Sequence, residues 1–492
     1  MSDLKSRTVT AIKWSYFSMF SGLALQLLFA AILSRLLTKE QFGVWYTATL
    51  LQSFGQFIAN LGVGQAIVQK AKLTDDDVRA GFTSSILLGV LATALAWISA
   101  PYAGTYFNNP DLVPIFRAYS WVFVINSGIV VSHSLLRRAL KFRPLVISEL
   151  SMYILGHGIL GLGSAYLGYG TYSLVISALS QGLIQLIILY AATRHTLRPV
   201  FRWSAYKDLY LFGTRATVVT FLEFISGSLD TFLIAKLYNP AALGLYSRTF
   251  STIAQPAMGF AMSLSRVLAP SFSAVQGEPE RLKRAYLSGL RALSLIIFTA
   301  AGCIVVDAPE IVRVMLGPTF LDSIVLMQIF AFFIPFSVLT NLSGVLAEAT
   351  AHLKSKIVIQ STYFITLLIA FWSTHQLGMG VEAFAVVLVI WSVFRSAAFA
   401  ILARRIIQGG GRDIAFSYLL GGACGLGAAL LTAAIVIPLR AILPLPALFI
   451  TEVILGGLML GGVVILGPPN ELQRMAKASL SRLTRRSANS AG

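Results

Sequence analysis

Several charged and polar side chains lie inside long apolar runs of this chain, and they are the residues best suited to bind ions. A helix over residues 243–268, at about 100° per residue, would place four of them, together with Gly259, within about a 60° arc: Arg248, Thr252, Gln255 and Arg266. A stripe with two guanidinium groups could line an anion-binding cleft. The alternative is that both arginines extend toward the two lipid headgroup regions.

A second stripe carries carboxylates. A helix over 211–235 would place Arg215, Glu223, Ser226 and Asp230 within about an 80° arc. A carboxylate in mid-membrane must be protonated or paired. We therefore predict Glu223 first, and Asp230 second, as the group that couples transport to a proton or sodium gradient. Asp230 could instead form a structural ion pair with Arg248.

Other polar residues complete the predicted cavity. The run 43–67 places three amides on one face, Gln52, Gln56 and Asn60, although hydrogen bonds between helices would explain them almost as well. Arg117, Asn126 and Arg395 are additional candidates, whereas His157 is predicted to be a buried, hydrogen-bonded histidine. No metal site and no cofactor are predicted.

The elements that position these residues are predicted to be membrane-spanning helices. The chain has 492 residues, of which 56% are hydrophobic and only 12% charged, about half the charged fraction of soluble proteins. Apolar runs of about 20 residues recur along the whole length, long enough to cross a bilayer. We expect an all-α polytopic membrane protein with about fourteen helices, over 14–36, 43–67, 80–100, 113–135, 145–167, 170–193, 211–235, 243–268, 287–307, 322–347, 356–375, 380–403, 415–438 and 446–466.

The positive charge follows the predicted topology. Of 38 Lys and Arg residues, 27 fall in the segments that are inside if the N-terminus is inside, and 5 fall in the outside segments. This alternation is the positive-inside rule. It predicts cytoplasmic N- and C-termini and attributes the net charge of +18 to topology and to anionic lipids rather than to nucleic acid.

One phrase of the sequence occurs twice. SRLLTKEQFGVW at 34–45 and AKLYNPAALGLY at 235–246 align at an offset of 201, with Gly43 matching Gly244. Six predicted helices separate the copies, so both turns lie on the same side of the membrane, as in a parallel repeat. We predict an N-terminal six-helix bundle (1–200), a C-terminal six-helix bundle (201–410), two additional helices (411–467) and a basic cytoplasmic tail (468–492).

Two short motifs are predicted to be structural. GHGILG at 156–161 fits a dinucleotide-binding pattern, but it lies in mid-span with no preceding strand, so it indicates close helix packing. The three aspartates at 75–77 follow Thr74 and precede a helix, which favours helix capping over metal binding.

The stretches LLTKEQFGVWYTATLLQSFGQFIANLGVGQAIVQ and LDTFLIAKLYNPAALGLYSRTFSTIAQP resemble the bacterial polysaccharide-transport proteins. These are the Wzx-type lipid-linked oligosaccharide flippases of the multidrug/oligosaccharidyl-lipid/polysaccharide exporter superfamily. The resemblance runs from about Thr8 to Pro468. It implies an alternating-access flippase of the bacterial inner membrane that carries an undecaprenyl-pyrophosphate-linked oligosaccharide for exopolysaccharide, O-antigen or capsule assembly. It also implies membrane lipids, a polysaccharide polymerase and chain-length or export machinery as partners.

Rival functions remain open at this point. A multidrug or other small-molecule exporter of the same superfamily shares the architecture, although the arginines favour an anionic ligand over a cationic drug. An enzyme is not expected, because the predicted outer loops are short and contain few candidate catalytic residues. A scaffold without transport activity would leave the charged stripes unexplained.

Overall fold

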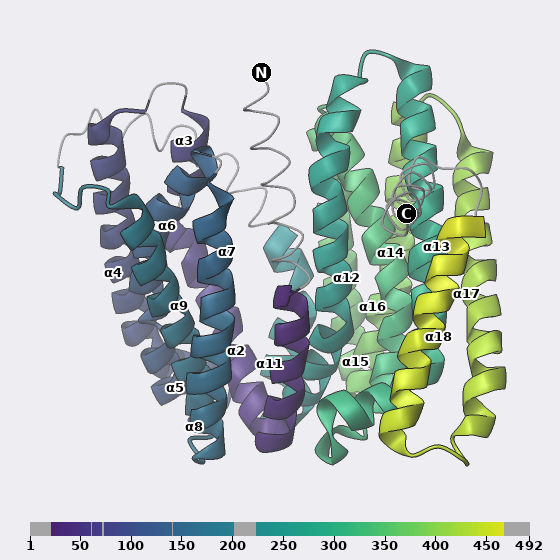
Figure 1. The fold of residues 1–492 in the computed structure, drawn as a ribbon, viewed down its shortest axis with the longest axis horizontal. Coiled ribbons are helices and arrows are strands. Elements are labelled where there is room, and N and C mark those ends of the chain that lie inside the picture. The colour runs from purple at the N-terminus through teal and green to yellow at the C-terminus, as the bar shows by residue number, and fades with distance from the viewer. Residues whose placement is uncertain (1–20, 61, 71–72, 140, 201–222, 467–492) are drawn as a thin grey trace, which may run out of the picture. The chain divides into compact units, whose positions relative to one another are not determined.

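The computed structural model describes residues 21–60, 62–70, 73–139, 141–200 and 223–466 (Figure 1). Every regular element in these ranges is helical. The chain divides into two compact units, the first formed by residues 1–248 with 315–319 and the second by 249–314 with 320–492. The predicted bundles, 1–200 and 201–410, do not coincide with these two units. Their boundaries remain a prediction.

The long helices of the first unit run roughly along one direction (Figure 1). In order they are the helix Ser21–Leu36, α2 (Lys39–Asn60), α3 (Val63–Gln69), α4 (Asp75–Tyr106), α5 (Leu112–Tyr119), α6 (Val122–Arg138), α7 (Phe142–Ser151), the π-helix η1 (Met152–Gly161), α8 (Leu162–Tyr166), α9 (Thr171–Thr193), α11 (Leu229–Leu237) and the start of α12 (Pro240–Ala274).

The second unit is also a set of long helices. It contains the rest of α12, α13 (Pro279–Ile311), α14 (Ser323–Ala349), α15 (Leu353–Gln376), α16 (Val381–Ile406), α17 (Gly411–Leu439) and α18 (Leu445–Leu466). The π-helix η2 (Val312–Leu316) and the short 3₁₀ helix η3 (Pro318–Phe320) each include residues of both units.

These helices confirm the predicted fold class. Ten helices in the described part of the chain are long and apolar enough to cross a membrane, and Ser21–Leu36 is a shorter apolar helix. One predicted span is interrupted: the run 43–67 divides into α2 and α3 at Gly62, whose φ of 75° is open to glycine because it has no Cβ. The predicted basic tail, 468–492, lies outside the described residues.

Both short motifs have the predicted structural roles. Thr74 and Asp77 form a capping box at the start of α4. In GHGILG, a Cβ added at Gly156 would lie 2.8 Å from the backbone nitrogen of Gln181 in α9. The glycine therefore allows the π-helix and α9 to approach each other closely, as predicted.

The repeated phrase forms two equivalent helix starts. α2 begins at Lys39 and α12 at Pro240, which are 201 positions apart like the two sequence copies. Each helix has a polar N-cap at the preceding position: the Thr38 hydroxyl accepts the backbone N–H of Gln41, and the Asn239 side chain accepts that of Ala242. Such caps satisfy N–H groups that have no partner within the helix.

The glycines of the two copies make a reciprocal contact within the first unit. A Cβ added at Gly43 would lie 1.8 Å from the backbone oxygen of Pro240, and one added at Gly244 would lie 1.8 Å from that of Lys39. Each glycine thus meets the first residue of the other helix, the pattern that a two-fold axis produces. The phrase is repeated because both helix starts need a glycine at this crossing.

Glycines also set the helix spacing in the second unit, where α13 packs along α17. A Cβ at Gly302 would lie 2.1 Å from the backbone oxygen of Gly425, and one at Gly425 would lie 2.6 Å from that of Phe298. Small residues at such crossings are typical of membrane helices, because lipid provides no hydrophobic force between them.

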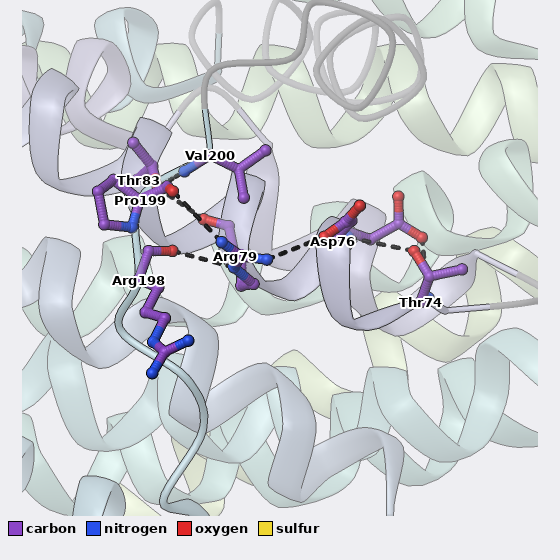
Figure 2. A network of polar contacts seen from close by, with 8 residues as sticks. Thr74, Asp76, Arg79, Thr83, Arg198, Pro199 and Val200 are labelled. Atoms are coloured by element: carbon purple, nitrogen blue, oxygen red, sulfur yellow. Dashed lines mark hydrogen bonds and ion pairs between the residues drawn. The ribbon is translucent and has the colours of Figure 1, made fainter.

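The segment that follows α9, residues 194–200, is held against α4 (Figure 2). The Arg79 side chain donates to the backbone oxygens of Arg198 (3.2 Å) and Pro199 (3.5 Å), and the Val200 N–H donates to the Thr83 hydroxyl (3.2 Å). Arg79 also pairs with Asp76 on its own helix at 3.2 Å. These contacts fix the beginning of the connection that leads out of α9.

His195 anchors the same segment. Its Nε2 lies 3.1 Å from the hydroxyl of Ser132 in α6, and its ring packs against Phe82 and Tyr190. Burial lowers the pKa of the His195 imidazole, because the charged form loses its hydration.

We predict that Gly43→Ala and Gly244→Ala each destabilise the protein by about 1–3 kcal/mol, because a methyl group cannot fit against the opposing carbonyl. The control is Gly163→Ala, at a helical glycine with no atom within 4 Å of its added Cβ. Thermal unfolding of the purified protein in lipid measures the effect. Equal melting temperatures for all three variants would contradict the reciprocal crossing.

Acidification should loosen segment 194–200. The pKa of the His195 imidazole is about 6.5 when the segment is open and lower when the segment is folded. The open segment therefore binds a proton more readily. Stability from this group is complete above pH ~6.5 and decreases as the pH falls below that value. We expect the hydrogen-exchange protection of residues 194–200, corrected for the pH dependence of intrinsic amide exchange, to decrease between about pH 7.5 and pH 5.5 more in the wild type than in His195→Gln. An identical pH response in both proteins would refute this role of His195.

Candidate functional site

Arg248 is the most buried of the predicted cavity arginines whose side chains the structure describes. It lies in the third turn of α12 and is only 9% exposed. Its Nε donates to the Ser34 hydroxyl at 2.8 Å, a second guanidinium nitrogen donates to the Ala30 backbone oxygen, and the guanidinium lies 4.8 Å from the Phe42 ring centroid. The guanidinium is therefore fixed inside the first unit, against the helix Ser21–Leu36.

Three of the predicted amides form one network. The Gln52 side chain donates to the Gln56 carbonyl oxygen at 2.9 Å, and the Asn126 side chain donates to the same oxygen at 3.2 Å. The network joins α2 to α6 in the first unit. It agrees with both interpretations of the sequence, a polar wall and hydrogen bonds between helices.

His157 is hydrogen-bonded, as predicted. Its Nδ1 lies 2.8 Å from the Ser177 hydroxyl and 3.2 Å from the Gln181 amide nitrogen, both in α9. The charge of Arg248 acts electrostatically on this imidazole. The π-helix carries His157, and π-helical turns often occur at functional sites. Sequence analysis missed Ser177 and Gln181, although they lie one helical turn apart on α9.

The two predicted coupling carboxylates belong to the first unit. Asp230, 5% exposed, accepts a hydrogen bond from the Tyr246 hydroxyl at 2.9 Å. Within the described residues, its side chain interacts with Tyr246 and Thr231 and not with Arg248, so the alternative ion pair is not formed. Glu223 is half-buried in the helical stretch 223–227.

Arg117 and Arg395 each have a buried side-chain nitrogen without a hydrogen-bond acceptor in the described structure. The Nε atom of each is buried and has no hydrogen-bond partner in the described ranges. The Arg117 guanidinium stacks 5.4 Å from the Trp97 ring in the first unit, and that of Arg395 stacks 4.5 Å from the Tyr363 ring in the second. An aromatic ring face stabilises the charge of a guanidinium without using its N–H groups, which remain available to an anion.

The remaining predicted residues are less well placed or undescribed. Thr252 is half-buried and Gln255 exposed on the part of α12 that belongs to the second unit. Arg215 lies outside the described residues, as do the side chains of Arg266 and Asn60. The cavity assignment of the whole set remains a prediction.

Sequence analysis missed a carboxylate cluster in the second unit. Asp307 and Glu310 of α13 and Glu452 of α18 are 6%, 0% and 3% exposed, and Arg440 binds Glu310 through two nitrogens at 3.0 and 2.8 Å. The available signal was the presence of three acidic residues in apolar runs, where charge is costly. Among the described residues, no group of three or more His, Cys, Asp or Glu is arranged to hold a metal ion.

Two relatives are similar to this chain over much of its length. An uncharacterized membrane protein in the cps region of Klebsiella pneumoniae is 25% identical over 387 residues, 77% of this chain and 78% of that protein. The lipopolysaccharide biosynthesis protein WzxC of Escherichia coli K12 is 20% identical over 329 residues, 66% of this chain and 67% of that protein.

Among solved structures, the lipid II flippase MurJ in an inward closed conformation matches with a TM-score of 0.71 at 13% identity, covering 92% of this chain and 97% of that chain. This likeness concerns the fold. The family described as "Polysaccharide biosynthesis protein" matches residues 32–325, more than half of the chain. The chain is therefore a multi-pass helical membrane protein of the polysaccharide biosynthesis protein family, as its resemblance to the Wzx-type proteins indicated.

Proposed function

We propose that this protein is an alternating-access flippase that moves an undecaprenyl-pyrophosphate-linked oligosaccharide across a bacterial inner membrane. The observation that carries the proposal is the buried guanidinium of Arg248 in a chain of the polysaccharide biosynthesis family. Ionisable groups inside membrane proteins mark substrate and ion pathways, because an unused charge there costs several kcal/mol.

The chemistry of the side chains favours an anionic headgroup. A pyrophosphate has oxygens that accept hydrogen bonds, and arginine donates several in a fixed planar geometry. Arg117 and Arg395 each hold a buried Nε without an acceptor in the described structure. Amides such as Gln52 and Asn126 suit sugar hydroxyls, which both donate and accept. The lipid tail of the substrate can remain in the bilayer.

The orientation follows from the charge distribution. We infer that both termini are cytoplasmic, because the lysines and arginines concentrate in segments on that side. The headgroup would be taken up from the cytoplasmic side and released on the outer side. A polysaccharide polymerase and export machinery would then use the flipped unit.

The transport is proposed to be coupled to an ion gradient through Glu223 or Asp230. A carboxylate that gains and loses a proton as the site changes its exposure can link the two processes. Asp230 accepts a hydrogen bond from the Tyr246 hydroxyl. Glu223 remains the first candidate and Asp230 the second, as predicted from the sequence.

Replacing Arg248 should reduce flipping. Arg248→Gln removes the charge but keeps polar atoms, and loss of charge-assisted hydrogen bonds worth about 1.5–3 kcal/mol corresponds to a roughly 10- to 100-fold slower rate. Arg248→Lys, which keeps the charge, should retain more activity. Translocation of a fluorescent lipid-linked oligosaccharide in proteoliposomes measures the rate. The matched control is Arg281→Ala, which removes an exposed arginine paired with Glu278 and should have little effect.

The same variants, with Arg395→Ala added, separate the flippase from a multidrug exporter. In cells we expect lost polysaccharide export with unchanged drug resistance. Unchanged export with lost resistance would assign the protein to drug efflux instead.

For coupling, Glu223→Gln should make translocation insensitive to an imposed gradient, because the amide cannot bind or release a proton. Flipping without a gradient should continue. The test compares translocation rates in proteoliposomes with and without a pH or sodium gradient. A variant that still follows the imposed gradient would exclude Glu223 as the coupling group.

A further inference from the structure

Three carboxyl groups of the second unit converge where α13, α17 and α18 meet. α13 ends at Ile311, α17 ends at Leu439 and α18 begins at Leu445, so all three helices have an end at this place. Asp307 and Glu310 lie one turn apart on α13. Glu452 lies seven residues into α18, about 10 Å along the helix axis from its start.

Glu310 has cationic partners in this cluster. Its carboxylate accepts two hydrogen bonds from the Arg440 guanidinium, at 3.0 and 2.8 Å, and Arg313 lies 3.8 Å away. This two-pronged pair joins the last turn of α13 to the end of α17. The Glu310 carboxylate and the two arginines therefore have oppositely charged partners.

Glu452 and Asp307 are not neutralised in the same way. Glu452 is 3% exposed, and neither of its oxygens has a hydrogen-bond donor among the described residues; the same is true of Oδ1 of Asp307, which is 6% exposed. α18 packs against α13, and the Glu452 carboxyl is close enough to those of Glu310 and Asp307 for their charges to interact. Two carboxyl groups can hydrogen-bond to each other only when one of them carries a proton.

We propose that Glu452, facing Glu310 and Asp307, forms a proton-binding site between α18 and α13. The bound proton lies on the Glu452 carboxyl and is donated toward Glu310. Its loss would leave a buried, unpaired negative charge near two other carboxyl groups, and neighbouring like charges disfavour ionisation. A proton fits better than a metal ion, because no suitable group of ligands surrounds the site in the described structure.

Two arginines border the site. The Arg440 and Arg313 side chains are 32% and 51% exposed, and both residues lie at the ends of spans. Because the chain leaves the membrane where a span ends, protons can reach the site from the aqueous phase at this end of the helices. The charged and titratable groups that face Glu452 are Asp307 and Glu310 of α13 and Arg440 at the end of α17.

The inference adds a proton site to the predicted Glu223 and Asp230. Proton binding itself does not depend on the proposed function, but its effect on transport does. When the proton leaves, repulsion between Glu452 and Glu310 should weaken the packing of α18 on α13. Transport measured at the same pH on both sides would then decrease as the pH rises.

The test is infrared difference spectroscopy of the purified full-length protein in lipid over a pH series, which detects the C=O stretch of protonated carboxyl groups. We expect a band in the wild type that disappears with rising pH and is missing from Glu452→Gln. Glu382→Gln, an exposed carboxylate at the start of α16, is the matched control and should keep the band. The same band in Glu452→Gln as in the wild type would overturn the proposal.

A second variant keeps the test decisive if Glu452→Gln folds poorly. Asp307→Asn removes one neighbouring negative charge, so Glu452 should lose its proton at a lower pH and the band should disappear earlier in the series. A band that titrates at the wild-type pH, or at a higher one, would contradict the site.

A transport measurement separates this inference from the proposed function. Translocation in Glu452→Gln at symmetric pH should lose the decline at high pH that the wild type shows. If the wild-type protein translocates no lipid-linked oligosaccharide, the proposed function fails while the infrared result still decides the proton site.

Discussion

The close crossing of two helix starts determines much of the first unit. Gly43 and Gly244 each allow a backbone carbonyl of the other helix to lie where a side chain would otherwise be. Because the contact is reciprocal, neither glycine could change alone without separating both helices. Arg248 follows Gly244 by one helical turn, and its guanidinium reaches Ser34 and Ala30 on the helix that precedes α2. The position of the arginine thus depends on a contact between two glycines.

The membrane imposes a second constraint, the cost of charge in a medium without water. The structure meets it in three ways. Arg440 and Glu310 neutralise each other, and Arg117 and Arg395 lie against aromatic rings. Glu452 has neither kind of partner, so a proton is the remaining way to remove its charge. Under the proposed function, the arginines that have an N–H without an acceptor bind the anionic headgroup. The carboxyl groups that lack a cationic partner bind the proton.

Sequence and structure agree most closely where local rules apply. The start of α4 follows from the Thr74 cap, and the spans follow from runs of apolar residues. Spacing along a helix also predicted that Gln52 and Gln56 would be neighbours. It could not show that Asn126 of α6 joins them, because helical periodicity describes one helix and not its partner.

The sequence by itself determined the helical membrane fold, the repeated turn and the family, because hydrophobicity, helix caps and a 201-residue offset can all be read along one dimension. Only the tertiary structure decided which polar groups meet. Asp230 accepts a hydrogen bond from Tyr246 and is not paired with Arg248. Glu452 lies near Glu310, which is 142 positions away in the sequence. Such pairings depend on how helices pack and rotate against one another, and side-chain contacts far apart in the chain fix that rotation.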